Sequence, residues 1–236
     1  MAAVRLEKYL ADAGCGSRSQ IKALLKQGRV CVDGNIEKDG SRREDYAQHE
    51  VRLDGSVVSY EKYVYYLLNK PQGVVSATKD ALSDTVIGLL AGVNTKGLFP
   101  VGRLDKDTEG LLLITNDGEL AHNLLSPKKH VAKKYYVNLD KALSEEDRIR
   151  IENGIDIGDE KPCLPAKIER AEKAGDPGDL SCMITIMEGR YHQVKRMFEA
   201  CGLTVTYLKR ISMGNLTLPE TLHPGEFLKI DREEIL

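Results

Sequence analysis

Residues 102–118 read GRLDKDTEGLLLITNDG, a polar loop bounded by glycines that leads directly into a run of aliphatic residues. The aliphatic run over residues 111–115 predicts a buried strand, and the polar residues before it predict a loop. A loop mounted on a rigid strand can present a reactive side chain. The loop holds three carboxylates, on Asp105, Asp107 and Glu109, and their spacing alone does not select one of them. An ordinary solvated turn, in which Asp105 only caps a backbone N–H group, is the competing interpretation.

The chain after residue 60 predicts a mixed α+β fold. Strands are expected over residues 63–68, 111–115, 135–139, 168–172, 182–187 and 203–211. Helices are expected over residues 84–90, 118–125, 144–152 and 191–201. Because strands outnumber helices and do not alternate with them regularly, a layered α+β architecture fits better than a doubly wound sheet.

Residues 1–60 have a pattern of their own, and we place the domain boundary between residues 60 and 61. Leu6, Tyr9 and Leu10 recur at helical spacing. A second helix is expected to begin after Ser17 as its N-cap and to end at Gly28. Asp-Gly pairs at residues 33–34 and 54–55 predict two tight hairpin turns after these helices.

The charge is unevenly distributed along the chain. Thirty-four lysines and arginines stand against 36 aspartates and glutamates in 236 residues, a net charge of −2, which excludes a uniformly basic nucleic-acid-binding surface but allows a local one. Residues 1–30 hold only two acidic residues against six basic ones, namely Arg5, Lys8, Arg18, Lys22, Lys26 and Arg29. Arg18, Lys22 and Lys26 are spaced four apart, so they share one face of the second helix. We interpret this stripe as a phosphate-binding ridge rather than an ordinary solvated helix face, because each neutralised phosphate releases a counterion.

Several classes of protein are not indicated. No apolar run approaches the roughly 18 residues that a membrane span needs, and the N-terminal residues lack the apolar core of a secretory signal. The five cysteines are scattered and form no CxxC pair, so neither a disulfide framework nor a zinc site is expected. We expect a cytoplasmic protein without a metal and without membrane association.

Two further segments combine basic and aromatic residues. In residues 188–201 an apolar stripe reads as the core face of a helix, formed by Val194, Met197, Phe198 and Cys201. Basic side chains gather near the start of that helix, a favourable place for an anion such as an RNA phosphate: Arg190, His192, Lys195 and Arg196. His192 could act as a general base, but an RNA-contacting or structural role is the better interpretation. In residues 128–136, Lys133 and the tyrosines Tyr135 and Tyr136 could contact phosphate and stack on a base.

Together these segments resemble known modules. Residues 4–10, 17–22 and 28–34 resemble the S4-type RNA-binding domain. Residues 68–76, 102–118, 133–137 and 188–198 resemble the RsuA/RluB/RluE/RluF-type pseudouridine synthases, and residues 192–197 with 222–227 look most like the RsuA branch. The resemblance implies an S4-like domain at residues 1–60 and a catalytic domain at 61–236, built on a mixed, mostly antiparallel sheet with flanking helices.

The resemblance also implies an activity and assigns residues to it. The expected reaction converts one uridine of ribosomal RNA to pseudouridine, most closely the uridine 516 type of 16S RNA in the small subunit or its assembly intermediates. Asp105 matches the catalytic residue of the family, Lys195 its basic partner, Tyr135 the ring against the target base and Arg103 a residue that helps to hold the flipped nucleotide. Isomerisation needs no cofactor, and the family resemblance suggests a monomer. The remaining basic residues named above, including Lys133, are expected to contact RNA.

Three alternatives stay open at this stage. The chain could be a non-catalytic RNA-binding or ribosome-assembly factor, or a synthase that acts on 23S RNA. A glycosidase that uses Asp105 and Glu109 as its carboxylate pair is the weakest of the three, because it leaves the basic N-terminal segment unexplained. The sequence does not choose between attack on the sugar, attack on the base and deprotonation of the sugar.

Overall fold

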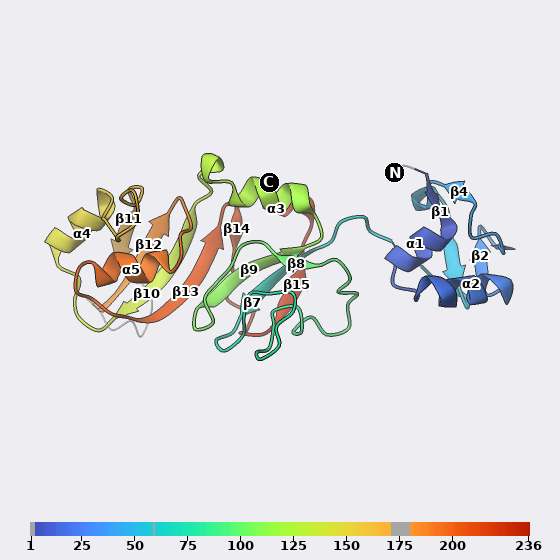
Figure 1. The fold of residues 1–236 in the computed structure, drawn as a ribbon, viewed down its shortest axis with the longest axis horizontal. Helices are drawn as coiled ribbons and strands as arrows, with labels where there is room; N and C mark the ends of the chain where they lie inside the picture. Colours follow the sequence, from blue (N-terminus) through green and yellow to red (C-terminus); the bar gives the residue numbers. More distant parts are fainter. Residues whose placement is uncertain (1–2, 59, 171–179) are drawn as a thin grey trace. The chain divides into compact units, whose positions relative to one another are not determined.

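The computed structural model describes residues 3–58, 60–170 and 180–236, and the chain divides into two compact units. One unit comprises Met1–Tyr63 with Gly92–Lys96, and the other comprises Val64–Ala91 with Gly97–Leu236 (Figure 1). The end of the strand predicted over residues 168–172 lies outside the described residues. No helix of the described segments is long and apolar enough to cross a membrane.

The first unit packs two helices against a small sheet. Its helices are α1 (Leu6–Asp12) and α2 (Arg18–Lys26), and its four-stranded sheet has the order β3-β2-β5-β6. The strands are β2 (Val30–Val32), β3 (Asn35–Ile36), β5 (Val51–Leu53) and β6 (Ser56–Val57), while β1 (Val4–Arg5) pairs with β4 (Arg43–Glu44) and a 3-10 turn, η1, covers Tyr46–Gln48. The two helices and the sheet enclose a core that includes Leu6, Leu10 and Ile21.

The local signals read from this part of the sequence are confirmed. Ser17 caps α2 by accepting a hydrogen bond from the backbone N–H of Gln20, and the side-chain Oε1 atom of Gln20 accepts one from the backbone N–H of Ser17. Both Asp-Gly pairs connect antiparallel strands, and all four of their residues have positive φ, as tight hairpin turns require: Asp33, Gly34, Asp54 and Gly55.

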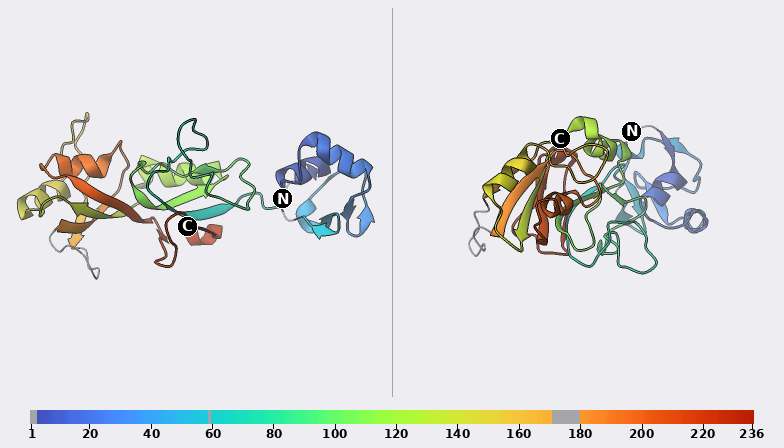
Figure 2. Two further views of the ribbon diagram at one scale, coloured as in Figure 1. Left: turned by 90° about the horizontal axis from the view of Figure 1, so that it is seen from below. Right: turned by 60° about the vertical axis from the view of Figure 1, so that its left-hand side comes forward.

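The second unit is built on one large sheet with the strand order β11-β12-β10-β13-β9-β7-β15 (Figures 1 and 2). Its strands are β7 (Tyr65–Lys70), β9 (Glu109–Thr115), β10 (Lys133–Leu139), β11 (Lys167–Arg170), β12 (Ser181–Ile186), β13 (Val205–Met213) and β15 (Phe227–Lys229). Two short strands, β8 (Phe99–Pro100) and β14 (Leu216–Thr217), pair with β9 and β13. The sheet is mixed and mostly antiparallel, as expected, and its parallel pair is β9 with β13.

Helices flank both ends of this sheet. The flanking elements are α3 (Gly118–Leu125), α4 (Glu145–Glu152), α5 (Gln193–Glu199), α6 (Arg232–Ile235) and the 3-10 turn η2 (Pro127–Lys129). Helix α4 lies beside β11 and α5 beside β13, whereas α3 lies near β9 at the other end (Figure 1). Aliphatic side chains of β7 and β9, among them Leu67, Leu111 and Leu113, form a core with Leu120 of α3.

The helix predicted over residues 84–90 is wrong, because that segment forms turns. Val75 uses the backbone groups that a helix would need: its N–H donates to Asp84, and its carbonyl accepts from Val86. The β-branched residues Thr85 and Val86 are compatible with this extended pairing. The segment therefore joins the loop that carries Ser76 instead of forming a separate helix.

The close approach of β9 to β13 depends on one glycine. Gly110 has φ +104° and faces Arg210 across the parallel pair. A Cβ atom at position 110 would lie 2.2 Å from the carbonyl oxygen of Arg210 and 2.7 Å from its nitrogen. The glycine that closes the polar loop is therefore required by backbone packing as well as by backbone conformation.

Candidate active site

The polar loop before β9 is fixed by backbone hydrogen bonds on both sides of Asp105. The Ser76 hydroxyl donates to the carbonyl of Leu104 at 2.8 Å and accepts from its N–H at 3.0 Å. On the other side, the N–H of Gly73 donates to the carbonyl of Lys106 at 2.8 Å, and Thr108 closes a turn onto the Asp105 carbonyl at 3.1 Å. The loop thus presents the Asp105 side chain from a rigid support.

Two side chains from the start of α5 meet the Asp105 carboxylate. The Nζ atom of Lys195 lies 3.3 Å from its Oδ2 atom, and the Nε2 atom of His192 lies 3.4 Å from its Oδ1 atom. The Asp105 side chain is 26 % exposed, so the carboxylate is sheltered but accessible. The predicted meeting of Asp105 with Lys195 across 90 positions of sequence is present in the structure, and His192 joins it.

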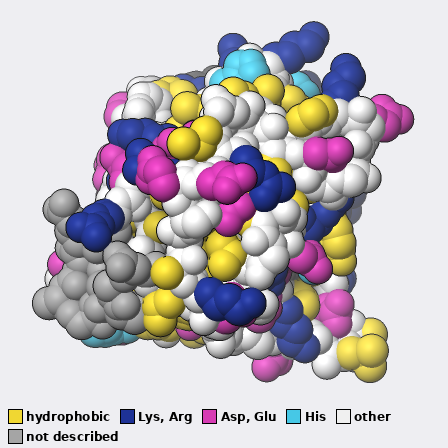
Figure 3. Space-filling view, turned by 90° about the vertical axis from the view of Figure 1, so that its left-hand side faces the viewer, with side chains coloured by type: hydrophobic (Ala, Val, Ile, Leu, Met, Phe, Trp, Pro, Cys, Tyr) yellow, Lys and Arg dark blue, Asp and Glu magenta, His cyan; other side chains and the backbone are white. Residues whose placement is uncertain are grey.

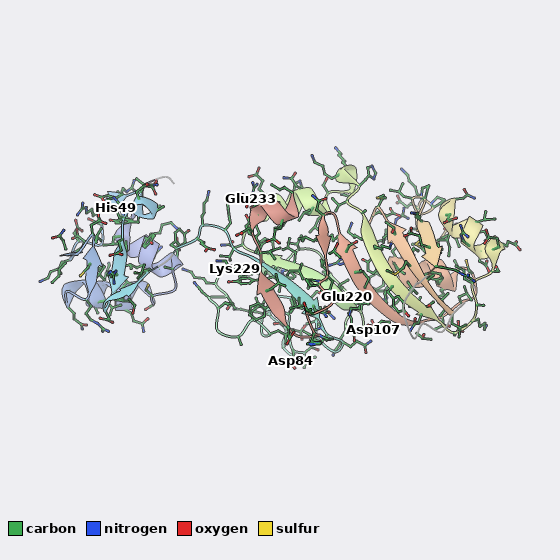
Figure 4. The ribbon with its side chains drawn as sticks, turned by 180° about the vertical axis from the view of Figure 1, so that it is seen from behind. His49, Asp84, Asp107, Glu220, Lys229 and Glu233 are labelled. Atoms are coloured by element: carbon green, nitrogen blue, oxygen red, sulfur yellow. The ribbon has the colours of Figure 1, made fainter. Side chains whose placement is uncertain are left out.

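Lys195 is shared with a second carboxylate. Its Nζ atom donates to Oδ1 of Asp107 at 2.6 Å, closer than to Asp105, although the Asp107 side chain is 70 % exposed. Asp107 lies in the middle part of the second unit (Figure 4). Burial lowers the pKa of Lys195, but the hydrogen bond that it donates to Asp107 and the charges of both carboxylates outweigh this effect, so the pKa is raised. The same bond to Lys195 lowers the pKa of Asp107.

Asp105 opens onto a pocket of about 620 Å³, within the usual size of small-molecule sites. Tyr135 is buried in its lining, and the exposed Arg103 also lines it, with no hydrogen-bond or ion-pair partner among the described residues. The lining also includes Lys133, His192, Lys195 and Arg210. Tyr136, next to Tyr135 on the strand, points the other way and packs edge-on against Tyr207. The pocket therefore combines a carboxylate, one buried ring and several cations.

Glu109 does not share this pocket. Its carboxylate accepts a hydrogen bond from the Tyr207 hydroxyl at 2.6 Å, and the residue is not part of the pocket lining. The alternative in which Asp105 and Glu109 act as a glycosidase pair is therefore wrong, because the two carboxylates do not face a common substrate.

Comparison with known proteins decides the family. A model of the RNA pseudouridylate synthase family matches residues 64–200, and an S4 domain model matches residues 4–43. The chain belongs to the RNA pseudouridylate synthase family. An uncharacterised RNA pseudouridine synthase of Bacillus subtilis is 48 % identical, with 98 % of this chain and 97 % of the relative covered. Ribosomal small subunit pseudouridine synthase A of Vibrio cholerae is 38 % identical, with 98 % of each chain covered. A crystal structure of a pseudouridylate synthase superimposes with a TM-score of 0.68 at 35 % identity over 98 % of both chains.

The synthase has two buried basic residues near this loop that were not predicted from the sequence. Lys70, at the end of β7, is fully buried, and its ammonium donates to the carbonyls of Pro71, Lys106 and Thr108. Arg210 is 2 % exposed, donates from Nε to the Leu111 carbonyl, and has an Nη2 atom without a partner among the described residues. A lysine or arginine within an apolar strand pattern was the available signal, because a buried cation needs a specific reason.

Burial of Lys70 makes stability depend on pH above neutrality. Burial lowers the pKa of Lys70 to about 8 from 10.5, against the attraction of Asp107, Asp105 and Glu109. Between those values the unfolded chain binds more protons than the folded chain, so the free energy of unfolding rises with pH. Relative to Lys70→Met, the wild-type synthase is expected to gain about 1–3 kcal/mol between pH 8 and 10.5 in urea unfolding.

The matched control for this prediction is Lys106→Met, on the same loop but exposed. The free energy of unfolding of that variant should change with pH as it does for wild type, because the Lys106 ammonium contacts water in both the folded and the unfolded chain. A constant difference between wild type and Lys70→Met across this pH range would contradict the assignment.

The structure separates the predicted RNA-contacting cations of the first unit into two groups. Three of them are engaged in ion pairs: Arg5 with Glu7, Lys8 with Asp12, and Arg29 with Asp54. Arg18, Lys22 and Lys26 are exposed on α2, whose Ile21 and Leu25 are buried, and they form no ion pair within the described part of the chain. The stripe is thus the part of this cluster best suited to bind phosphate.

We expect the change of Arg18, Lys22 and Lys26 to glutamate to weaken RNA binding and to flatten its salt dependence. Three lost phosphate contacts would lower the slope of log K against log salt by about two to three. Filter binding at several salt concentrations measures this slope. The control replaces Arg5, Lys8 and Arg29 with glutamate, and its salt slope should fall by less than that of the stripe variant. An unchanged slope in the stripe variant would show that the stripe is ordinary surface.

The predicted cations of the second unit are partly committed to internal contacts. Arg190 bonds Glu188 and the carbonyls of Lys161 and Pro162, and Arg196 bonds Asp159 and the Ile157 carbonyl. These contacts hold residues 157–162 against α5, and direct RNA contact by either arginine stays a prediction. The Lys133 ammonium is buried in the pocket wall, which lowers its pKa. On the face at the α4 and β11 end of this unit, acidic and basic side chains are interspersed (Figure 3).

Proposed function

We propose that this synthase isomerises a specific uridine of small-subunit (16S) ribosomal RNA, of the uridine 516 type, with Asp105 as the catalytic group. The observation that carries the catalytic assignment is the Asp105 carboxylate at the pocket, 3.3 Å from the ammonium of Lys195. The name of the Vibrio cholerae relative supports the choice of ribosomal RNA. We propose that residues 1–60 bind RNA, that residues 61–236 carry out the reaction, and that the protein works as a cytoplasmic monomer.

The chemistry fits the groups at the pocket. Isomerisation breaks the N–C glycosidic bond of uridine, rotates the uracil ring and rejoins it through carbon 5, so atoms and electrons are conserved. The ring cannot rotate while stacked, so the nucleotide must leave the RNA helix and enter the pocket. Asp105, whose carboxylate lies 3.3 Å from the ammonium of Lys195, acts as a nucleophile or as a base toward the sugar. Tyr135 packs against the uracil, and Arg103 holds the nucleotide at the pocket edge.

Site mapping tests the substrate. Purified protein is incubated with free 16S RNA, partly assembled small subunits, complete small subunits and 23S RNA, and the products are mapped by a pseudouridine-specific chemical label and mass spectrometry. One modified uridine in 16S RNA, in at least one of the assembly states, supports the proposal. Modification confined to 23S RNA would transfer the activity to the large subunit.

The same mapping addresses a non-catalytic role. A factor that only assists ribosome assembly would bind the RNA and leave every uridine unmodified. Because the family is an enzyme family, we expect turnover; binding without product in all four substrates would overturn the proposal.

A further inference from the structure

A pair of stacked rings lines the pocket, and one of the two rings is exposed to solvent. The rings of Tyr191 and His192 lie 3.9 Å apart with an angle of 15° between their planes. Tyr191 is 77 % exposed, whereas Tyr135 in the same pocket lining is buried. Since aromatic rings gain free energy by leaving water, the open Tyr191 ring is available to pack against a ligand at the pocket.

The backbone holds this pair away from the helix. His192 is the N-cap of α5 in a left-handed conformation, with φ +47°, which few residues other than glycine adopt. The carbonyl of Tyr191 accepts a hydrogen bond from Arg196, which is itself bonded to Asp159. The helix predicted from residue 191 therefore starts at Gln193, and the two residues before it project their rings at the pocket. A strained conformation that is fixed in this way is typical of a functional site.

The pair connects the pocket entrance to the carboxylate. His192 contacts Asp105 through Nε2 at 3.4 Å on one side and stacks on Tyr191 on the other. One face of the tyrosine ring is covered by the imidazole, and its high exposure leaves area for a further planar group.

Extrusion of a base creates such a planar group. When one nucleotide leaves the stack, its neighbour loses a stacking partner, and aromatic side chains commonly replace it. We propose that the open face of Tyr191 stacks on the base adjacent to the extruded uridine, with His192 supporting the ring from behind. This inference rests on the proposed function and adds a flanking-base site to it. Because stacking depends on ring area rather than on hydrogen bonds, the site favours a purine over a pyrimidine.

A double-mutant cycle between protein and RNA tests the site. The substrate is a short RNA hairpin that contains the mapped uridine, prepared with an intact or an abasic nucleotide on its 5′ or 3′ side. Single-turnover conversion is measured with wild type, Tyr191→Ala and Tyr191→Phe. Since stacking contributes about 1–3 kcal/mol per base, Tyr191→Ala should lower kcat/KM by about 5- to 150-fold, and Tyr191→Phe should stay close to wild type.

The cycle gives distinct outcomes. With wild type, an abasic nucleotide on one side of the uridine should lower kcat/KM by as much as Tyr191→Ala does on the intact hairpin. With the Tyr191→Ala protein, the same abasic nucleotide should lower kcat/KM little further. An abasic nucleotide elsewhere in the hairpin serves as the control and should cost both proteins equally. If the loss from Tyr191→Ala and the loss from the abasic nucleotide add independently, whether that nucleotide is 5′ or 3′ of the uridine, and wild type turns over normally, the flanking-base site alone is overturned. Absence of turnover by wild type on any ribosomal RNA would overturn the proposed function and this site with it.

A binding measurement gives a readout that does not depend on turnover. A 2-aminopurine base beside the uridine should lose fluorescence when Asp105→Asn protein binds the hairpin, because stacking on tyrosine quenches it. The Asp105→Asn, Tyr191→Ala double variant should bind with the fluorescence retained. Equal quenching by both proteins would contradict the stacking contact.

Discussion

We expect the Asp105→Asn protein to fold and to bind ribosomal RNA like wild type while its conversion of uridine falls by at least ~10³-fold. The amide keeps the shape of the side chain and its backbone support from Ser76, but it can neither attack carbon nor accept a proton from the sugar. Single-turnover assays on the mapped 16S fragment measure the rate, and filter binding measures the affinity.

Asp107→Asn is the matched control for this prediction. It removes a carboxylate from the same loop, and one that lies closer to Lys195 than Asp105 does. Because its side chain is mostly exposed, its ion pair with Lys195 contributes little, and the rate should change by less than about tenfold. If Asp105→Asn keeps its rate and Asp107→Asn loses it, Asp107 rather than Asp105 is the catalytic carboxylate, and our proposal is refuted.

The second large effect is on stability. Gly110→Ala should lower the free energy of unfolding by roughly 3 kcal/mol or more, because a Cβ atom would overlap the backbone of Arg210 and φ is +104°. To relieve the overlap between this Cβ atom and the Arg210 backbone, β9 would have to move away from β13, so activity should fall as well. Urea denaturation followed by circular dichroism measures the change.

Gly118→Ala is the matched control for Gly110→Ala. Gly118 begins α3, and a Cβ atom there would meet nothing within 4 Å. Alanine favours a helix over glycine by up to about 1 kcal/mol, so this variant should be as stable as wild type or more stable. Equal effects of the two substitutions would show that the approach at Gly110 is not the cause.

The long elements of the fold were predictable because their signals are local. The helix expected over residues 118–125 has these bounds in the structure, and strands β7, β9, β10, β12 and β13 lie within a few residues of their predicted positions. Short strands such as β8 and β15 were missed, because two or three residues hold a strand only through a partner elsewhere in the chain. The two-residue strand β14 was missed as well, although it pairs with the adjacent end of β13. The helix predicted over residues 84–90 does not form, because backbone hydrogen bonds with Val75, which lies outside the segment, decide its conformation.

The candidate site was only partly predictable. Residue types and glycine spacing located the loop, but physics left Asp105, Asp107 and Glu109 equivalent, and only the family resemblance selected Asp105. The structure separates them by partners: Glu109 bonds Tyr207, whereas the two aspartates share Lys195. The stacked pair of Tyr191 and His192 depends on a left-handed residue at the helix start, which no pattern of polarity indicates.

The parallel pairing of β9 with β13 is brief, with Lys209 opposite Glu109 and Arg210 opposite Gly110. The loop of Asp105 enters β9, while the helix of Lys195 leads into β13. The acid and its ammonium thus belong to opposite halves of the sheet, joined along this seam. A small shift of one half along the other would separate the two charges without unfolding either half. The distance between the Asp105 carboxylate and the Lys195 ammonium therefore reports how well the two halves of the sheet are aligned.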